Sequence, residues 1–191
     1  MDVLFSHAIG KNGQRGCSLM ETVRYTQRIC SDQQQIEDFL LSSRIGILAL
    51  KGDDFPYAVP VNYIWDKNAI YFHGMGSGKK NVLLAQNPPV CFTIYAEHGT
   101  VIDPVPCHAD TAYMSVMIFG KAEKLIDFAE SAVVMQKMID KYMPNYYSQP
   151  LTENLMEKYK SSLDGNGVGI YRIQADTVTA KENSVNPRNI F

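Results

Sequence analysis

Residues 71–80, YFHGMGSGKK, place a histidine, three glycines, a serine and two lysines directly after an apolar run. Glycines let a backbone approach an anion closely, and the start of a helix presents unpaired N–H groups together with the positive end of its dipole. Lys79 and Lys80 would add full charges, and Ser77 would add a hydroxyl. The pattern indicates a phosphate site, and the alternative is a flexible turn with solvated lysines.

The spacing of these glycines matches neither of the common nucleotide-binding motifs. A Walker A loop needs G-x-x-x-x-G-K-[ST], whereas Gly74 and Gly78 are one residue too close and Lys80 stands where Ser or Thr is required. The G-x-G-x-x-G pattern is absent as well. The stretch therefore predicts an anion site outside these two motif classes.

His73 is the candidate for proton transfer, because an imidazole titrates near neutral pH. Its alternative role is that of a hydrogen-bonded structural residue. Zinc is not predicted, because His73, Cys91, Cys107 and His108 follow no known ligand spacing. The absence of G-x-S-x-G also leaves a serine hydrolase without support.

The apolar segment AVPVNYIW contains Pro60 and Asn62. Proline cannot donate a ladder hydrogen bond, so it marks a strand edge or a bulge where neighbouring backbone groups are free to bind a ligand. Together with the anion site, this predicts a binding site for a planar cofactor that carries a phosphate. An edge strand with a surface asparagine is the alternative.

The composition bounds the class of protein. With 191 residues, of which 46% are hydrophobic, the chain is expected to form one domain over residues 24–191. Residues 1–23 are expected to be a flexible arm or an extension. The net charge of −2 gives no bulk attraction for nucleic acid or an anionic membrane. Four widely spaced cysteines and no long apolar run predict a cytoplasmic protein.

The hydrophobic periodicity predicts strands and helices in mixed order. Ser31 and Gln34 resemble a capping box at the start of the first helix. A loop of about fifteen residues is expected after residue 97. Strands are predicted at 44–51, 56–66, 69–74, 90–97, 113–126 and 167–182, and helices at 32–42, after Gly78, at 127–143 and at 152–165. This order predicts an α+β domain with an antiparallel barrel and peripheral helices.

Three pieces occur in the order H-x-x-x-x-G-x-K, N-P-x-V-x-F and Y-x-S-V-x-x-x-G. In that order they resemble the FMN-binding split-barrel proteins related to pyridoxamine 5'-phosphate oxidase, most closely the nitroimidazole-resistance (Nim-like) branch. The resemblance covers residues 24–181. It implies a six-stranded antiparallel split β-barrel (Greek key) that forms a homodimer with FMN near the interface.

The resemblance also implies the site residues. His73 would lie beside the flavin and is the implied catalytic residue. The implied cofactor-binding residues are Val59, Pro60, Val61, Asn62, Tyr63, Phe72, His73, Gly74, Ser77, Gly78, Lys79, Lys80, Tyr113, Ser115 and Val116. Which of Lys79 and Lys80 contacts phosphate stays open, because the family commonly has an arginine or another charged residue there.

The implied activity is that of an FMN-dependent oxidoreductase that passes electrons from reduced flavin to a small acceptor, such as a nitroaromatic or a quinone. The Arg and His set that holds pyridoxal phosphate in true pyridoxamine-phosphate oxidases has no evident counterpart near the C-terminus. Two alternatives remain: a flavin-binding or storage protein without catalysis, and a haem-binding split barrel with His73 as axial ligand. No metal, nucleic acid or membrane partner is expected.

Overall fold

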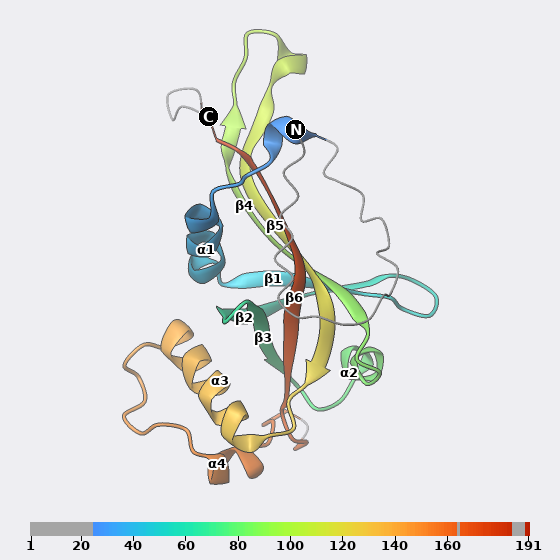
Figure 1. Cartoon of the computed structure of the whole chain (residues 1–191), viewed down its shortest axis with the longest axis vertical. Coiled ribbons are helices and arrows are strands. Elements are labelled where there is room, and N and C mark those ends of the chain that lie inside the picture. Colours follow the sequence, from blue (N-terminus) through green and yellow to red (C-terminus); the bar gives the residue numbers. More distant parts are fainter. Residues whose placement is uncertain (1–24, 164, 185–189) are drawn as a thin grey trace, which may run out of the picture.

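The computed structural model describes residues 25–163, 165–184, 190 and 191, and the predicted arm at 1–23 lies outside them. Six antiparallel strands form a closed barrel in the order β1-β2-β3-β6-β5-β4 (Figure 1). This confirms the predicted α+β barrel. The strands are β1 (Ile45–Leu50), β2 (Tyr57–Asp66), β3 (Ala69–Gly74), β4 (Pro89–Val101), β5 (Asp110–Lys124) and β6 (Gly169–Asn183). The helices are η1 (Thr26–Arg28), α1 (Gln33–Ser42), α2 (Lys79–Leu84), η2 (Pro106–His108), α3 (Phe128–Tyr142) and α4 (Glu153–Glu157).

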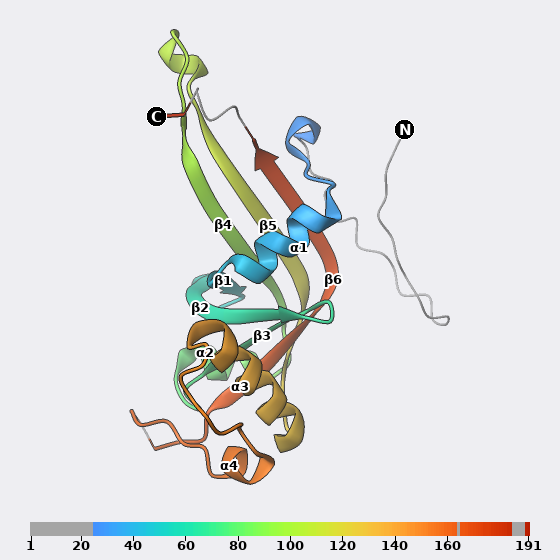
Figure 2. The same ribbon diagram turned by 90° about the vertical axis from the view of Figure 1, so that its left-hand side faces the viewer.

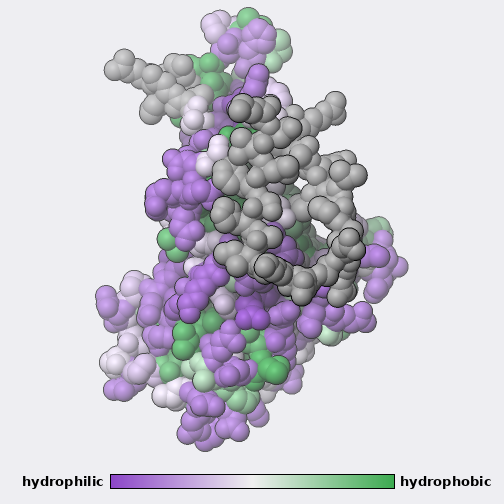
Figure 3. All heavy atoms as spheres, viewed as in Figure 1, coloured by the Kyte–Doolittle hydropathy of each residue, from purple (hydrophilic) through white to green (hydrophobic). Residues whose placement is uncertain are grey.

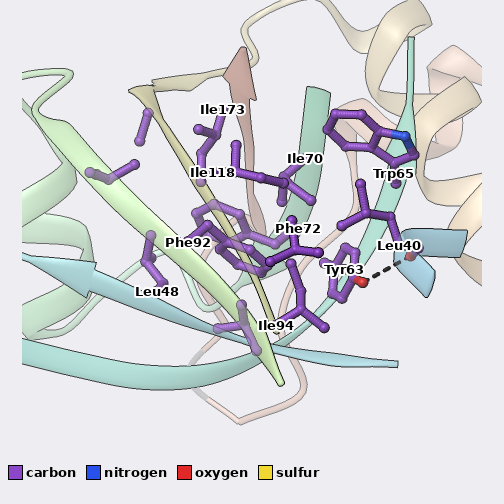
Figure 4. Close-up of a cluster of buried hydrophobic side chains, with 14 of the residues drawn as sticks. Leu40, Leu48, Tyr63, Trp65, Ile70, Phe72, Phe92, Ile94, Ile118 and Ile173 are labelled. Atoms are coloured by element: carbon purple, nitrogen blue, oxygen red, sulfur yellow. Dashed lines mark hydrogen bonds between the residues drawn. The ribbon is translucent and has the colours of Figure 1, made fainter. Parts of the chain in front are cut away.

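The barrel interior is filled by side chains from alternate positions of all six strands, as the two-residue period of a strand requires. The Phe92 ring covers Gly46, where any side chain would overlap it. Tyr63 is fully buried, and its hydroxyl donates to the carbonyl oxygen of Leu40 at 2.8 Å (Figure 4). This bond ties α1 to the end of the barrel.

A second apolar cluster lies on the outside of the barrel, where α3 and α4 cover Ile64, Tyr71 and Ile170 (Figure 2). In α3, Val134 is among the buried residues, whereas the neighbouring Val133 is exposed. Val134 therefore lies on the side of the helix that packs against the sheet. In the space-filling view, hydrophilic side chains with smaller apolar patches cover the part of the surface that contains these helices (Figure 3). The helices therefore present an apolar side to the sheet and a largely polar side to solvent.

Two helix boundaries differ clearly from the predictions. The N-cap of α1 is Asp32, not Ser31, because the Asp32 carboxylate accepts from the backbone N–H groups of Gln34 and Gln35 at 3.0 and 3.1 Å. The helix predicted at 152–165 ends at Glu157. Beyond the helix, Lys160 instead pairs with Gly167 in an isolated antiparallel bridge.

Almost half of the long loop predicted after residue 97 is strand. β4 and β5 continue as a hairpin through the pairs Gly99–Ala112 and Val101–Asp110. This hairpin projects beyond the barrel (Figure 1), and the loop shrinks to residues 102–109. Tertiary pairing, which one-dimensional turn signals do not reveal, explains the difference. The register between β5 and β6 shifts between Phe119 and Gly120.

Candidate functional site

The barrel opens between β2 and β3, and this β2–β3 opening positions the candidate site. The strands pair only from Tyr63–Phe72 to Asp66–Ala69. Within the described chain, the earlier half of β2 pairs with β1 alone. The edge predicted from Pro60 is therefore present, and Pro60 itself is exposed opposite Ile47.

Asn62 and His73 occupy the first unpaired position on each side of the β2–β3 opening. Both side chains are exposed, because each alternates with a buried neighbour, Tyr63 or Phe72. Two residues that are eleven positions apart in sequence thus share one face at the opening. An amide and an imidazole together can offer both hydrogen-bond donors and acceptors to a polar planar ligand.

Glycine is needed at Gly76 and at Gly78, in the loop after β3, for different structural reasons. A side chain at Gly76 would overlap the carbonyl oxygen of Gly167, so this glycine allows the loop to pack against the chain. Gly78 has φ 94°, which favours glycine, and its Cα faces open space just before α2. Only Gly78 therefore leaves backbone accessible in the way that an anion site requires.

The two lysines lie on opposite sides of the β2–β3 opening. Lys79 Nζ is 5.7 Å from the centroid of the Tyr57 ring, on β2. Lys80 Nζ is 5.8 Å from the centroid of the Phe72 ring, on β3, and lies against Gly74. Burial lowers the pKa of Lys80. The first turn of α2 thus places one ammonium group near each strand that borders the opening.

The electrostatics at the opening favour a neutral His73. Although the residue is exposed, surrounding protein atoms partly desolvate its ring, and this lowers its pKa. The charge of Lys80 lowers the pKa of His73 further. A neutral imidazole next to an ammonium group is suited to contact an anionic or electron-rich ligand.

The structure also brings three residues to this region that the sequence analysis did not identify. The Tyr171 ring stacks on Phe72 with centroids 5.2 Å apart, and its hydroxyl donates to Asn81 Oδ1 at 2.7 Å. This contact fixes α2 against the barrel. Tyr171, Asn81 and Lys124 also line a cavity of about 490 Å³ together with Gly76, Ser77 and Gly78. No sequence signal marked them, because each comes from a different element.

Three predicted site residues are completely buried in the barrel core, namely Tyr63, Phe72 and Val116. Their structural role is to support the strands behind the exposed positions. Val59 is half-buried and Val61 is buried, both on the side of β2 that faces the core. On this strand, Pro60 and Asn62 are the predicted residues with exposed side chains.

Tyr113 and Ser115 lie on β5, away from the β2–β3 opening. The outer row of paired residues Pro60, Ile47, Thr93 and Met117 crosses β2, β1, β4 and β5. At about 4.8 Å per strand, β5 lies roughly 14 Å from β2 along this row. His73 on β3 pairs with Ile170 on β6, whereas Ser115 pairs with Lys181, which lies further along β6 by about 35 Å at the usual rise of a strand. One chain therefore does not bring Ser115 and His73 together.

The described residues contain no group of three His, Cys, Asp or Glu side chains arranged to hold a metal ion. Among the helices in that same part of the chain, none has the length and apolar character needed to cross a bilayer.

Six antiparallel strands form this barrel, and two neighbours, β2 and β3, pair over only part of their length. Such a barrel belongs to the split-barrel class. Residues 32–182 match the family model described as pyridoxamine 5'-phosphate oxidase. Because this match covers most of the sequence, the chain belongs to the pyridoxamine 5'-phosphate oxidase family. A search of curated protein sequences gave no match.

Solved structures show the same fold at low identity. The flavocytochrome Anf3 from Azotobacter vinelandii matches with a TM-score of 0.73 and 19% identity over 87% of this chain and 74% of that one. A putative 5-nitroimidazole antibiotic resistance protein from Bacteroides thetaiotaomicron matches with a TM-score of 0.63 and 22% identity, over 80% and 85%. The FAD and heme binding protein from Mycobacterium smegmatis matches with a TM-score of 0.68 and 18% identity, over 84% and 75%. At these identities, the three structures support the fold alone.

Proposed function

We propose that this protein binds FMN at the β2–β3 opening and acts as an oxidoreductase that reduces a small acceptor, such as a nitroaromatic or a quinone. The observation that carries the proposal is the position of Asn62 and His73, exposed side by side, with Lys79 and Lys80 on either side of the opening. Family membership supports the choice of a flavin.

The residues present fit a flavin with a terminal phosphate. Gly78 leaves accessible backbone at the start of α2, and the two lysines supply up to two positive charges. A phosphate monoester carries about −1.5 to −2 charges at neutral pH, so the charges balance. The exposed edge of β2 around Pro60 offers a flat surface for a ring system.

The flavin would supply the electron transfer, and the protein would supply binding, orientation and protons. His73 would deliver a proton to the reduced acceptor, and Asn62 would hold a polar edge of the ring system in place. Because the pKa of His73 is lowered, its proton-donating form becomes abundant only at a pH below the usual range of a histidine.

We further propose that two copies of the chain form the complete site. The outer surface of the sheet, here called the outer sheet face, carries exposed apolar side chains at Ile45, Ile47, Tyr95 and Met117. Contiguous apolar residues of this kind favour burial against a partner. Dimerisation would allow Tyr113 and Ser115 of one copy to approach the β2–β3 opening of the other.

The free thiols of Cys30, Cys91 and Cys107 support a reducing, cytoplasmic setting.

The absorption spectrum of the purified protein tests the cofactor. Oxidised flavin absorbs at about 370 and about 450 nm, whereas an intense Soret band would indicate haem instead. Chromatography of the flavin released on denaturation then distinguishes FMN from FAD. A colourless protein that also fails to bind added FMN would overturn the proposal.

Riboflavin provides the matched ligand for the phosphate, because it is FMN without that group. We expect FMN to bind roughly tenfold to a hundredfold more tightly than riboflavin, as charge-assisted hydrogen bonds would give. The double variant Lys79→Met/Lys80→Met should remove most of this difference. Equal affinities in the wild-type protein would rule out the phosphate site.

Catalysis is tested by anaerobic reduction of the bound flavin, followed by addition of a nitroimidazole or a quinone. Faster reoxidation than in buffer alone supports the oxidoreductase, whereas no acceleration by either acceptor favours flavin storage.

A further inference from the structure

A cavity of about 250 Å³ lies between α1 and α3, over the end of β2 that pairs with β3. We call it the α1–α3 cavity. It is separate from the β2–β3 opening, and none of the proposed flavin residues lines it. Its lining combines the apolar residues Leu41, Ile64 and Trp65 with the charged residues Asp66, Lys137 and Lys141.

The two lysines of the α1–α3 cavity differ in how their charge is compensated. Lys137 Nζ is paired with the Asp66 carboxylate at 2.5 Å. Lys141 Nζ donates to the carbonyl oxygen of Ser43 at 2.6 Å and lies 4.5 Å from the centroid of the Tyr63 ring. None of the ion pairs in the described part of the chain includes Lys141. Its ammonium group therefore has hydrogen-bonding capacity and charge left for a ligand.

The charged groups packed around Lys141 leave a positive balance. Arg44 stacks over the Tyr142 ring at 4.6 Å and adds a second charge without a carboxylate partner. Glu37 on α1 accepts from the Trp65 indole at 2.7 Å. Among the residues that line the cavity itself, Lys137 and Lys141 stand against the single carboxylate of Asp66, which leaves one positive charge uncompensated. Burial, followed by the charge of Arg44, lowers the pKa of Lys141 to about 8.

We propose that the α1–α3 cavity binds a small organic monocarboxylate with a compact apolar body. The apolar body would contact Leu41, Ile64 and Trp65, and the carboxylate would pair with Lys141. Cavities for drug-sized ligands measure ~300–1,000 Å³, so this smaller cavity suits a smaller molecule. A single free ammonium group matches one carboxylate, whereas a phosphate would need more donors.

Trp65 makes the proposal directly measurable, because it is the only tryptophan in the chain and it lines the cavity. Cyclohexanecarboxylate is a suitable probe, because it combines an apolar ring with a carboxylate and does not absorb where tryptophan is excited. With roughly nine non-hydrogen atoms, it should bind with a Kd of about 1 mM. Cyclohexanecarboxamide is the matched uncharged control, and a saturable change in Trp65 fluorescence is expected with the carboxylate alone.

Three variants of the full-length protein separate the contributions. Lys141→Met should weaken carboxylate binding by about tenfold or more. Lys158→Met, which removes an exposed lysine directly after α4, should leave binding unchanged. Leu41→Phe fills the rim of the cavity at a half-exposed position and should block the probe even if Lys141→Met folds poorly.

The affinity of the carboxylate should also fall as the pH rises through about 8, because Lys141 then loses its charge. The proposal is overturned if the carboxylate and the carboxamide give the same response, or if Leu41→Phe binds the carboxylate as well as the wild-type protein does. The visible spectrum of any bound flavin should not change, because the β2–β3 opening lies elsewhere.

Discussion

Tyr63 on β2 and Phe72 on β3 form the last pair between these two strands, and both side chains are completely buried in the barrel core. The next residues along each strand, Asn62 and His73, are unpaired with each other and exposed. One step along the strands therefore takes the chain from the core to the candidate site. The rigidity of the core pair positions the two polar side chains beyond it.

His73→Gln should retain FMN and slow acceptor reduction by about 10²-fold, the lower end of what general acid catalysis contributes. Because the pKa of His73 is lowered, the wild-type rate should fall as the pH rises through a value below the usual ~6.5. The rate of the variant should not show this fall with rising pH. Stopped-flow reoxidation across a pH series measures both effects, and an unchanged rate and profile would remove His73 from the mechanism.

In the Lys80→Met variant, the pH at which the rate of acceptor reduction falls should be higher than in the wild-type protein. The reason is that the Lys80 charge helps to lower the pKa of His73, so its removal raises that pKa. Lys79→Met is the matched control, because Lys79 lies toward Tyr57 on the other side of the opening. NMR titration of the His73 ring gives the pKa in each protein directly. An equal shift of that pH in both variants would contradict the assigned geometry.

Gly74→Ala and Gly76→Ala should have different effects, although only Met75 separates the two glycines. At Gly74 the new methyl group meets the end of the flexible Lys80 side chain, which can move away. We therefore expect weaker FMN binding with little loss of stability. At Gly76 it meets the backbone of Gly167, and overpacking of this kind costs about 1–3 kcal/mol. Urea unfolding and FMN titration of both variants make the comparison, and equal stability losses would contradict it.

Tyr142→Phe should lower the free energy of unfolding by about 1–3 kcal/mol, because it leaves a backbone donor without its partner. The Tyr142 hydroxyl accepts from the Tyr63 N–H at 2.9 Å and lies within hydrogen-bond reach of the carbonyl oxygens of Tyr63 and Arg44. It thereby anchors α3 to the strands. Tyr146→Phe is the control, because Tyr146 is 75% exposed and should tolerate the change. Thermal unfolding of both proteins provides the measurement, and similar Tm values would argue against this anchor.

Ile47→Lys should convert the proposed dimer to a monomer and weaken FMN binding at the same time. Ile47 lies in the middle of the outer sheet face, between Pro60 and Thr93, and a charge there could not be buried against a partner. Leu163→Lys is the control, because Leu163 is exposed in a turn outside that face. Light scattering after size-exclusion chromatography gives the mass. A monomeric wild-type protein would contradict the shared site.

The amino-acid sequence by itself determined the local elements and the family. Alternating apolar residues located the strands, and the glycines and lysines after His73 marked the loop and the start of α2. Pro60 correctly indicated an edge, because a residue without an N–H cannot sit between two hydrogen-bonded neighbours. Each of these features depends on residues close together in the chain, where sequence patterns carry direct information.

The tertiary structure decided which residues are available to a ligand. Tyr63, Phe72 and Val116 carry the family pattern but are buried, because strand alternation turns them into the barrel core. The placement of Asn62 and His73 at one opening, the separation of Lys79 from Lys80, and the supporting contact of Tyr171 with Asn81 all involve different elements. Such contacts depend on strand register and helix placement, which are set by packing across the whole barrel and not by local sequence.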